Sequence, residues 1–368
     1  MTIGVWAYLD EYEEEKTDIL KAFEKVAGSG RLMFGPSSAA FEKEFSTYCE
    51  TQFGIGVDNG TNSITLSLLA LGLNPGDEVI TVSNTAVPTV CAIVNAGCIP
   101  RFVDIDPNTF LMSLEKLEEA IRPKTKCIVP VHLYGQCVDM DLLTEIAKSH
   151  DIKILEDCAQ AHGALYKGRK AGGLGDVGSF SFYPTKILGA YGDGGMITCN
   201  DPKIESVIRQ LKFYGMKGRY FAETQGFNSR LDEVQAEILR FKLKKLDNYL
   251  EKRKQIAHFY DQQLSSIESL QTPIIEAHNS HAYYLYVVRH KQRDRIIEKL
   301  REFDINLNVS YPWPIHTMPP YKTYSQDQPL IETEKASKEI FSLPMYPSLK
   351  SKDMHKVVEH IAKVIKEL

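Results

Sequence analysis

The residue with the clearest potential for chemistry is Lys186, which follows an apolar, aromatic segment (178–183) and precedes a glycine-rich turn (189–195). A lysine amine forms an imine with an aldehyde when burial and neighbouring cations favour its neutral, nucleophilic form. The glycines leave space for a flat ligand and let the backbone bend. Because an isolated lysine in such a turn is more often a surface residue, its interpretation depends on the residues around it.

Asp157, the first of these residues, follows the apolar segment 152–155 and precedes Lys186 by 29 positions. A carboxylate beside the pyridine nitrogen of pyridoxal phosphate keeps that nitrogen protonated, so that the ring accepts electrons from the substrate. Asp is also a common helix N-cap, which is the alternative role. Gln160 is expected to hydrogen-bond the ring hydroxyl and His162 to orient the cofactor, with helix capping as the alternative for both. Together with Lys186, these residues favour a pyridoxal-phosphate site.

A phosphate-binding turn is predicted at residues 57–63, where Gly60 and Thr61 come directly before an apolar helical segment. Backbone N–H groups at a helix start have no acceptor within the helix, and the aligned peptide dipoles favour an anion there. Similar turns begin many helices that bind no ligand. The prediction therefore depends on Lys186 and Asp157.

The chain alternates short apolar strands with helical segments, which predicts an α/β fold with a mostly parallel sheet. Strands are expected at 55–57, 78–82, 101–103, 127–131 and 152–155. Open α/β sheets bind ligands at the carboxyl ends of their strands. The polar residues that follow the expected strands, and that should gather there, are Asp58, Ser83, Asp104, His132 and Asp157.

Helical segments are predicted before and after this region. An amphipathic helix ending near residues 28–30 has an apolar stripe of Ile19, Leu20, Phe23 and Val26. A long polar helical region at 232–264 precedes a strand at 283–289 and a helix at 293–303. We therefore expect a large domain over residues 1–240 and a smaller C-terminal α+β domain over residues 241–368, which begins with a linker helix.

Composition limits the classes of partner. The formal net charge is -5 and the basic residues are dispersed along the 368 residues, so no nucleic-acid partner is expected. The N-terminus does not resemble a signal peptide, and no apolar run reaches the ~20 residues of a membrane span, which predicts a cytoplasmic protein. The seven cysteines lack a metal-ligand spacing, so we expect reduced thiols and no metal site.

Taken together, these residues resemble the DegT/DnrJ/EryC1/StrS family of fold-type-I, pyridoxal-phosphate-dependent sugar aminotransferases. The likeness runs from about residue 5 to about residue 350. The matching segments are 58–62, 75–79, 156–163, 181–186, 192–195 and 228–233. The resemblance implies a large, mostly parallel sheet domain with a small C-terminal domain.

The resemblance also implies a homodimer with two active sites at the subunit interface. Ser181 and the backbone near Gly60 and Thr61 would bind phosphate, and Asn228 would reach the phosphate held by the partner subunit. Family members often place an aromatic residue over the cofactor ring. This sequence has Ala86 at that position and so departs from the family there.

Retention of Lys186 favours amino transfer, because the branch of the family that removes a sugar hydroxyl has histidine at that position. The sequence is especially similar to members that make 3-amino-3,6-dideoxyhexoses on dTDP, in segments 6–9, 131–136, 214–216 and 310–316. The resemblance therefore implies transfer from L-glutamate to a dTDP-3-keto-6-deoxyhexose. Basic and aromatic candidates for the substrate entry, each with an ordinary surface or packing role as the alternative, are Arg31, His162, Tyr183, Lys217, Arg219, Tyr220, Tyr311, Trp313 and His316.

Other functions stay open at the level of sequence. The amino group could instead go to a dTDP-4-keto-6-deoxyhexose. A fold-type-I enzyme with a small substrate would show a carboxylate-binding arginine or a mobile nucleophilic cysteine, and neither is evident, although Arg230 is not excluded. A non-catalytic, cofactor-binding regulator would carry a helix-turn-helix or a basic segment, and none is evident. A nucleotide-sugar oxidoreductase would need a GxGxxG turn after its first strand, which is missing.

Overall fold

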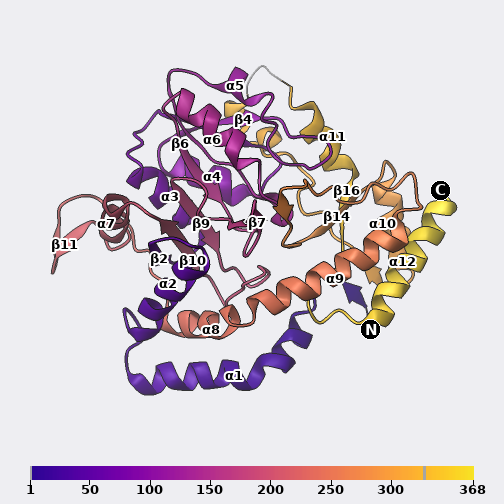
Figure 1. Cartoon of the computed structure of the whole chain (residues 1–368), viewed down its shortest axis with the longest axis horizontal. Coiled ribbons are helices and arrows are strands. Elements are labelled where there is room, and N and C mark those ends of the chain that lie inside the picture. The colour runs from indigo at the N-terminus through magenta and orange to yellow at the C-terminus, as the bar shows by residue number, and fades with distance from the viewer. Residues whose placement is uncertain (1, 326–328) are drawn as a thin grey trace.

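A seven-stranded sheet forms the centre of the molecule in the computed structural model, which describes residues 2–325 and 329–368 (Figure 1). In spatial order its strands are β2 (Phe53–Val57), β10 (Gly195–Cys199), β9 (Val177–Ser181), β6 (Lys153–Asp157), β5 (Thr125–Ile128), β3 (Glu78–Val82) and β4 (Ile99–Val103). All neighbours are parallel except β10, which is antiparallel to β2 and β9. The carboxyl ends of the six parallel strands therefore share one edge, as the sequence predicts.

Helices cover both faces of this sheet, because its strands are apolar on both sides. One face packs under α3 (Gly60–Ala70), α4 (Val87–Asn95) and α7 (Pro202–Leu211), with strand residues such as Ile55 and Val79 in that core. The other packs against α2 (Pro36–Tyr48), α6 (Met140–Ser149) and α8 (Glu233–Leu243), with Ile80 and Phe180 in its core. The doubly covered sheet gives the strand ends a rigid support.

The predicted N-terminal helix is α1 (Tyr8–Ser29), which lies along the lower side of the molecule in Figure 1. It ends where the glycines predict, because Gly30 takes a left-handed φ of 68° at the C-cap. Its apolar stripe is only partly buried. Ile19 and Val26 pack inward, whereas Leu20 and Phe23 remain 53% and 56% exposed.

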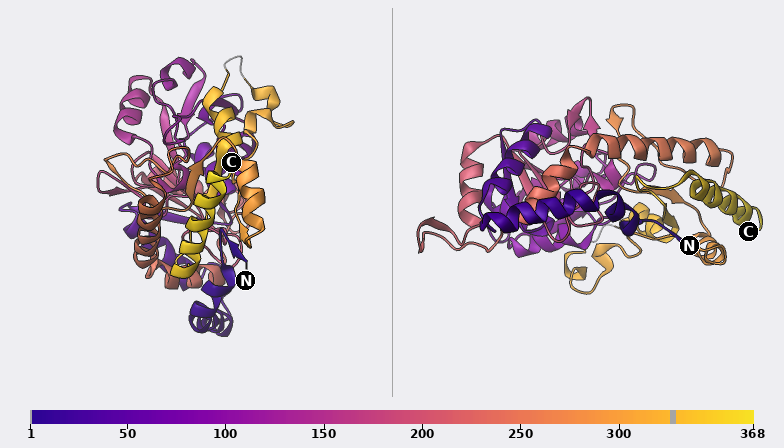
Figure 2. Two further views of the ribbon diagram at one scale, coloured as in Figure 1. Left: turned by 90° about the vertical axis from the view of Figure 1, so that its right-hand side faces the viewer. Right: turned by 90° about the horizontal axis from the view of Figure 1, so that it is seen from below.

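The C-terminal part has its own apolar core. The predicted long helix is two helices, α8 and α9 (Leu246–Leu264), and α9 leads to a two-stranded antiparallel sheet of β14 (Tyr286–Arg289) and β16 (Ile340–Leu343). Around it lie α10 (Arg293–Arg301), α11 (Ile331–Glu339) and α12 (Ser351–Lys366). Figure 2 shows α9 running from the sheet domain into this part.

The N-terminus also belongs to this C-terminal core. β1 (Ile3–Gly4) pairs in parallel with β15 (Ile305–Asn306), and Ile3 is buried among residues of α9 and α10. This contact joins residues on the two sides of the predicted domain boundary at residue 240. The boundary itself stays a prediction.

Short elements complete the described chain: α5 (Leu117–Ala120), β7 (Leu165–Tyr166), β8 (Arg169–Lys170), β11 (Met216–Gly218), β12 (Phe221–Ala222), β13 (Asn279–Ser280), and the 3-10 turns η1 (Leu133–Gly135), η2 (Ile315–Thr317) and η3 (Lys322–Tyr324). Among the helices of the described residues, none combines the length and apolarity that crossing a membrane requires.

Glu233, at the start of α8, fixes the beginning of α2. Its buried carboxylate accepts hydrogen bonds from the backbone N–H groups of Gly35 (2.9 Å), Ser37 (2.8 Å) and Ser38 (2.8 Å), and from the Ser38 hydroxyl. These N–H groups have no acceptor within the helix. Burial raises the pKa of Glu233, but the donated hydrogen bonds outweigh it and hold the pKa below its ordinary value.

We expect Glu233→Gln to lower the free energy of unfolding by about 2 kcal/mol, because an amide N–H would face backbone donors. Chemical denaturation at pH 7 measures the loss. Since the pKa of Glu233 is lowered in the folded state, its contribution is complete above the ordinary pKa of 4.5 and is lost as the pH falls through the folded value. The neighbouring exposed Asp232→Asn is the control, and an equal loss there would contradict the assignment.

Candidate active site

A cavity of about 440 Å³ opens at the carboxyl edge of the central sheet. Its walls come from the turns after β2, β3, β6 and β9, and they include every predicted cofactor-binding residue except Asn228. The lining residues are Asn59, Gly60, Thr61, Ile64, Thr85, Ala86, Pro88, Thr89, Asp157, Ala159, Gln160, Ser181, Tyr183, Lys186 and Asp193. The fold thus brings together residues that are far apart in the sequence.

Asp157 is held in a fixed orientation at the end of β6. Its Oδ2 accepts a hydrogen bond from Thr89 Oγ1 (2.7 Å), and its Oδ1 accepts one from the backbone N–H of Ala159 (3.1 Å). Thr89 lies in the first turn of α4 and is itself within 3.1 Å of Thr85 Oγ1. Sequence reasoning missed Thr89, because a threonine in a first helical turn carries no signal of its own.

The start of α3 has the form of an anion site. Asn59 caps the helix by accepting the N–H of Asn62 (2.8 Å). Gly60 and Thr61 of the same turn, whose N–H groups have no acceptor within the helix, line the cavity. A Cβ on Gly60 would lie 2.7 Å from the Cβ of Ser181, so only glycine lets the helix start approach this serine. A phosphate fits such a site, since backbone N–H groups, a hydroxyl and the helix dipole converge on it.

Lys186 is half-buried in the turn after β9. Its backbone N–H donates to Tyr183 O (2.8 Å), and a Cβ on Gly189 would lie 2.4 Å from Pro184 O, so the turn requires glycine there. The Nζ atom stands 4.7 Å from the ring centroid of Tyr284. Tyr284 belongs to the C-terminal part and was not predicted, since it lies about 100 residues further along the chain.

Gln160 is bonded on both sides of its amide. Its Oε1 accepts the backbone N–H of Tyr134 (2.9 Å), and its Nε2 donates to the hydroxyl of Tyr311 (2.5 Å). The rings of Tyr134 and Tyr311 stack with their centroids 6.2 Å apart. Burial raises the pKa of Tyr311 well above its ordinary value, so this phenol remains neutral. Tyr311 therefore supports a cavity residue instead of lining the cavity itself.

Two other predicted substrate residues lie away from the cavity wall. His162 is buried between Phe180 and Phe182, with ring centroids 5.4 and 5.8 Å away, and neither ring nitrogen has a hydrogen-bond partner among the described residues. Burial lowers the pKa of His162 to about 3, with the Lys186 charge as a further cause. His316 bonds Ser83 through Nδ1 (2.7 Å) and Glu334 through Nε2 (3.3 Å). His162 thus packs against aromatic rings and His316 joins Ser83 to Glu334, and neither lines the cavity.

The remaining predicted entry residues are exposed. Lys217, Arg219 and Tyr220 lie in and around the β11–β12 hairpin, which projects from the body at the left of Figure 1. Arg31 and Trp313 are exposed as well. None of these five lines the cavity within the single chain.

Asn228 also lies outside the cavity wall. Its side chain is exposed, and its neighbour Ser229 donates a hydrogen bond to Asp58 Oδ1. Of the other polar residues at strand ends, Asp104 accepts the backbone N–H groups of Glu332 (3.0 Å) and Thr333 (2.9 Å) at the start of α11. It therefore has a capping role.

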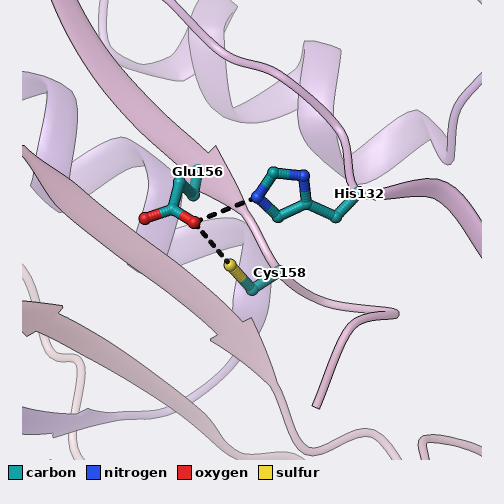
Figure 3. A group of neighbouring side chains, drawn as sticks. All are labelled: His132, Glu156 and Cys158. Carbon is teal, nitrogen blue, oxygen red and sulfur yellow. Dashed lines mark hydrogen bonds and ion pairs between the residues drawn. The ribbon is translucent and has the colours of Figure 1, made fainter. Parts of the chain in front are cut away.

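Figure 3 shows a buried cluster of His132, Glu156 and Cys158 whose polar atoms lie within 4.8 Å of one another. Hydrogen bonds explain this cluster without a metal ion. The Nδ1 of His132 accepts the N–H of Val138 (3.2 Å), so its Nε2 carries the proton that it donates to Glu156 (3.0 Å). The Glu156 carboxylate also accepts backbone N–H groups from a neighbouring turn, namely those of Gly172, Leu174 and Gly175, at 2.7 to 2.8 Å.

The mostly parallel sheet, with a lysine and an aspartate on one cavity and a helix start beside them, has the architecture of the fold-type-I pyridoxal-phosphate enzymes. The chain belongs to the DegT/DnrJ/EryC1/StrS aminotransferase family, whose model matches residues 13–362.

Curated relatives match the chain over nearly its full length. It is 50% identical to the dTDP-3-amino-3,4,6-trideoxy-alpha-D-glucose transaminase of Micromonospora megalomicea subsp. nigra, with 99% of each chain covered. It is 41% identical to the pleiotropic regulatory protein of Geobacillus stearothermophilus, with 98% of each covered.

Solved structures agree with the fold. DesV from S. venezuelae, in complex with a ketimine intermediate, has a TM-score of 0.96 at 36% identity, covering 98% of each chain. NtdA from Bacillus subtilis, with the bound cofactor PMP, has a TM-score of 0.90 at 34% identity, covering 96% of this chain and 82% of its own.

Glu156→Gln should lower the free energy of unfolding by about 3 kcal/mol, because it leaves buried N–H donors without a charged acceptor. Burial raises the pKa of Glu156, but the His132 hydrogen bond and the backbone donors lower it below its ordinary value. The loss is therefore complete at neutral pH and shrinks as the pH falls through that lowered pKa. Denaturant unfolding measures it. Cys158→Ala, which keeps the carboxylate, should cost about 1 kcal/mol, and a reversed order of the two variants would refute the hydrogen-bond explanation.

Proposed function

We propose that this chain is a pyridoxal-phosphate-dependent aminotransferase that converts a dTDP-3-keto-6-deoxyhexose into the dTDP-3-amino-3,6-dideoxyhexose, with L-glutamate as the amino donor. The observation that carries the proposal is that Lys186 and Asp157 line one cavity beside the start of α3. The substrate class is supported by the 50% identity to a transaminase named for a dTDP-3-amino sugar.

Each wall of the cavity suits one part of the cofactor. The start of α3, with Ser181, would bind the phosphate, and Gln160 would face the ring hydroxyl. Asp157, oriented by Thr89 and Ala159, would hold a proton on the pyridine nitrogen. Ala86 leaves one side of the cavity without an aromatic side chain at that position.

When bound, pyridoxal phosphate supplies an aldehyde for the amine of Lys186 and a ring that accepts electrons. Lys186 would hold the cofactor through its amine and, once released by the amino donor, would carry the proton from the α-carbon of glutamate to the cofactor. In the second half of the exchange the same amine would carry a proton from the cofactor to the sugar C3 carbon. Asp157, held by Thr89 and Ala159, would stay beside the ring nitrogen.

A homodimer would give the exposed entry residues a function. Lys217, Arg219, Tyr220 and Asn228 lie on the surface of one chain, away from its own cavity. Tyr220 and the adjacent Phe221 are 87% and 66% exposed, and contiguous exposed apolar side chains mark association surfaces. In a dimer these residues would reach the cavity of the partner, with Asn228 at its phosphate.

The cytoplasmic location stays a prediction.

A second candidate is a non-catalytic regulator that binds the cofactor, which is favoured by the 41% identity to a protein named as regulatory. Both candidates use the same cavity. Turnover distinguishes them, because a regulator would bind the cofactor without aminating a sugar.

Purified protein incubated with L-glutamate and a dTDP-3-keto-6-deoxyhexose should yield the 3-amino sugar, detected by mass spectrometry. The dTDP-4-keto isomer, in a separate reaction, should remain unchanged because its carbonyl lies at the neighbouring carbon. Amination of the 4-keto sugar alone would overturn the positional assignment. Binding of cofactor without amination of either sugar would favour the regulator.

Lys186→Ala should abolish both turnover and the visible absorption band that bound pyridoxal phosphate gives on a lysine. Asp157→Asn is the matched comparison, since it keeps the shape and an acceptor for Thr89 but loses the charge. It should retain the band and lower kcat about a hundredfold or more. A Lys186→Ala variant that still turns over would show that the lysine is misassigned.

A further inference from the structure

The amine of Lys186 lies over an aromatic ring from the C-terminal part of the chain. Its Nζ is 4.7 Å from the ring centroid of Tyr284, in the segment before β14. This segment is held in place. Arg253, buried in α9, donates from Nη1 to the carbonyls of Tyr283 (3.0 Å) and Tyr284 (3.3 Å) and of Met345 (2.8 Å). The ring is therefore a fixed partner of the lysine.

A second contact joins the same two segments. The hydroxyl of Tyr284 lies 3.2 Å from Thr185 Oγ1, directly before the lysine. One tyrosine thus contacts consecutive residues of the turn, with its ring at Lys186 and its hydroxyl at Thr185. The hydroxyl contact adds to the anchoring of the segment by Arg253, while the ring faces the amine.

The contact of Lys186 with the Tyr284 ring has to be considered together with the charged groups near the amine. Lys186 forms no salt bridge within residues 2–325 and 329–368. His162, buried beneath the turn, is neutral at physiological pH because burial lowers its pKa to about 3. The titratable or charged residues that share a cavity with Lys186 are Asp157, Tyr183 and Asp193 on one side, and Glu11, Glu14, Glu15, Lys242, Tyr249, Lys252 and Arg253 on the other.

We propose that Tyr284 is a positioning residue that receives the amine of Lys186 on its ring face when this amine is free of the cofactor and carries a proton. The face of an aromatic ring attracts an ammonium group and not a neutral amine. Tyr284 therefore favours the proton-carrying form of the released lysine and keeps it beside the cavity. This role rests on the proposed function, since it concerns the lysine that would bind pyridoxal phosphate.

The test measures how fast the full-length, cofactor-free protein captures added pyridoxal phosphate at a series of pH values, followed by growth of the visible band. The neutral amine is the reacting form, so the midpoint of the rate profile reports the pKa of the Lys186 amine. Tyr284→Leu removes the ring, and its midpoint should fall by about one pH unit. Well below the midpoint, capture should then be about tenfold faster than in wild type.

Two variants separate the ring from the hydroxyl. Tyr284→Phe keeps the ring face, and Thr185→Val removes the other side of the hydroxyl contact. Both should keep the wild-type midpoint. A shift in these two variants that equals the shift of Tyr284→Leu would assign the effect to the hydroxyl and overturn the proposal.

A series of aromatic side chains of similar shape tests the proposal even if Tyr284→Leu does not fold. Position 284 is filled in turn with phenylalanine and with its increasingly fluorinated analogues, which weaken the attraction of the ring face for a cation. The midpoint should fall stepwise with fluorination, and an unchanged midpoint across the series would overturn the proposal. Failure of wild type to form the band, or formation of the band by Lys186→Ala, would instead refute the proposed function.

Discussion

The site depends on the alternation of side chains along one strand. Glu156 and Asp157 are consecutive in β6, so their side chains point to opposite faces of the sheet. Glu156 faces the buried cluster with His132 and accepts N–H groups from the 172–175 turn, whereas Asp157 faces the cavity. The backbone of Asp157 is fixed as well, because it donates to Pro130 O (2.9 Å) and accepts from His132 N–H (3.1 Å). The hydrogen bonds of Glu156 thus fix the strand that carries Asp157, the acid proposed to face the cofactor.

The cavity is built by the sheet but supported from the C-terminal part. Tyr284 reaches Lys186, and Tyr311 reaches Gln160. Both tyrosines follow α9 in the chain, and Arg253 of that helix anchors the segment of the first. The two halves of the chain therefore meet at Lys186 and Gln160. The Tyr284 ring contacts the first and the Tyr311 hydroxyl bonds the second.

The sequence predicted the sheet and most residues of the cavity wall that it named, because local patterns and the family resemblance indicate both. Apolar runs bounded by turns specify buried strands, and the lysine, aspartate and glycine turns stand at strand ends where ligands bind. Contacts between distant segments left no such pattern. Nothing near residue 284 indicates that its ring faces Lys186, and Leu20 and Phe23 show the periodicity of a core while remaining exposed. His162 is polar and close to Asp157 in sequence, yet its ring turns into the apolar packing around Phe180.

The pairing of β1 with β15 ties the beginning of the chain to its last third. From that anchor α1 runs back to the sheet domain, where it packs on α8. The C-terminal part is therefore attached to the sheet domain both through α9 and through this N-terminal strap. If the C-terminal part rotated away from the sheet domain, either α1 would have to move with it or Ile3 would have to leave its apolar surroundings. The architecture thus resists a large opening of the C-terminal part away from the sheet domain.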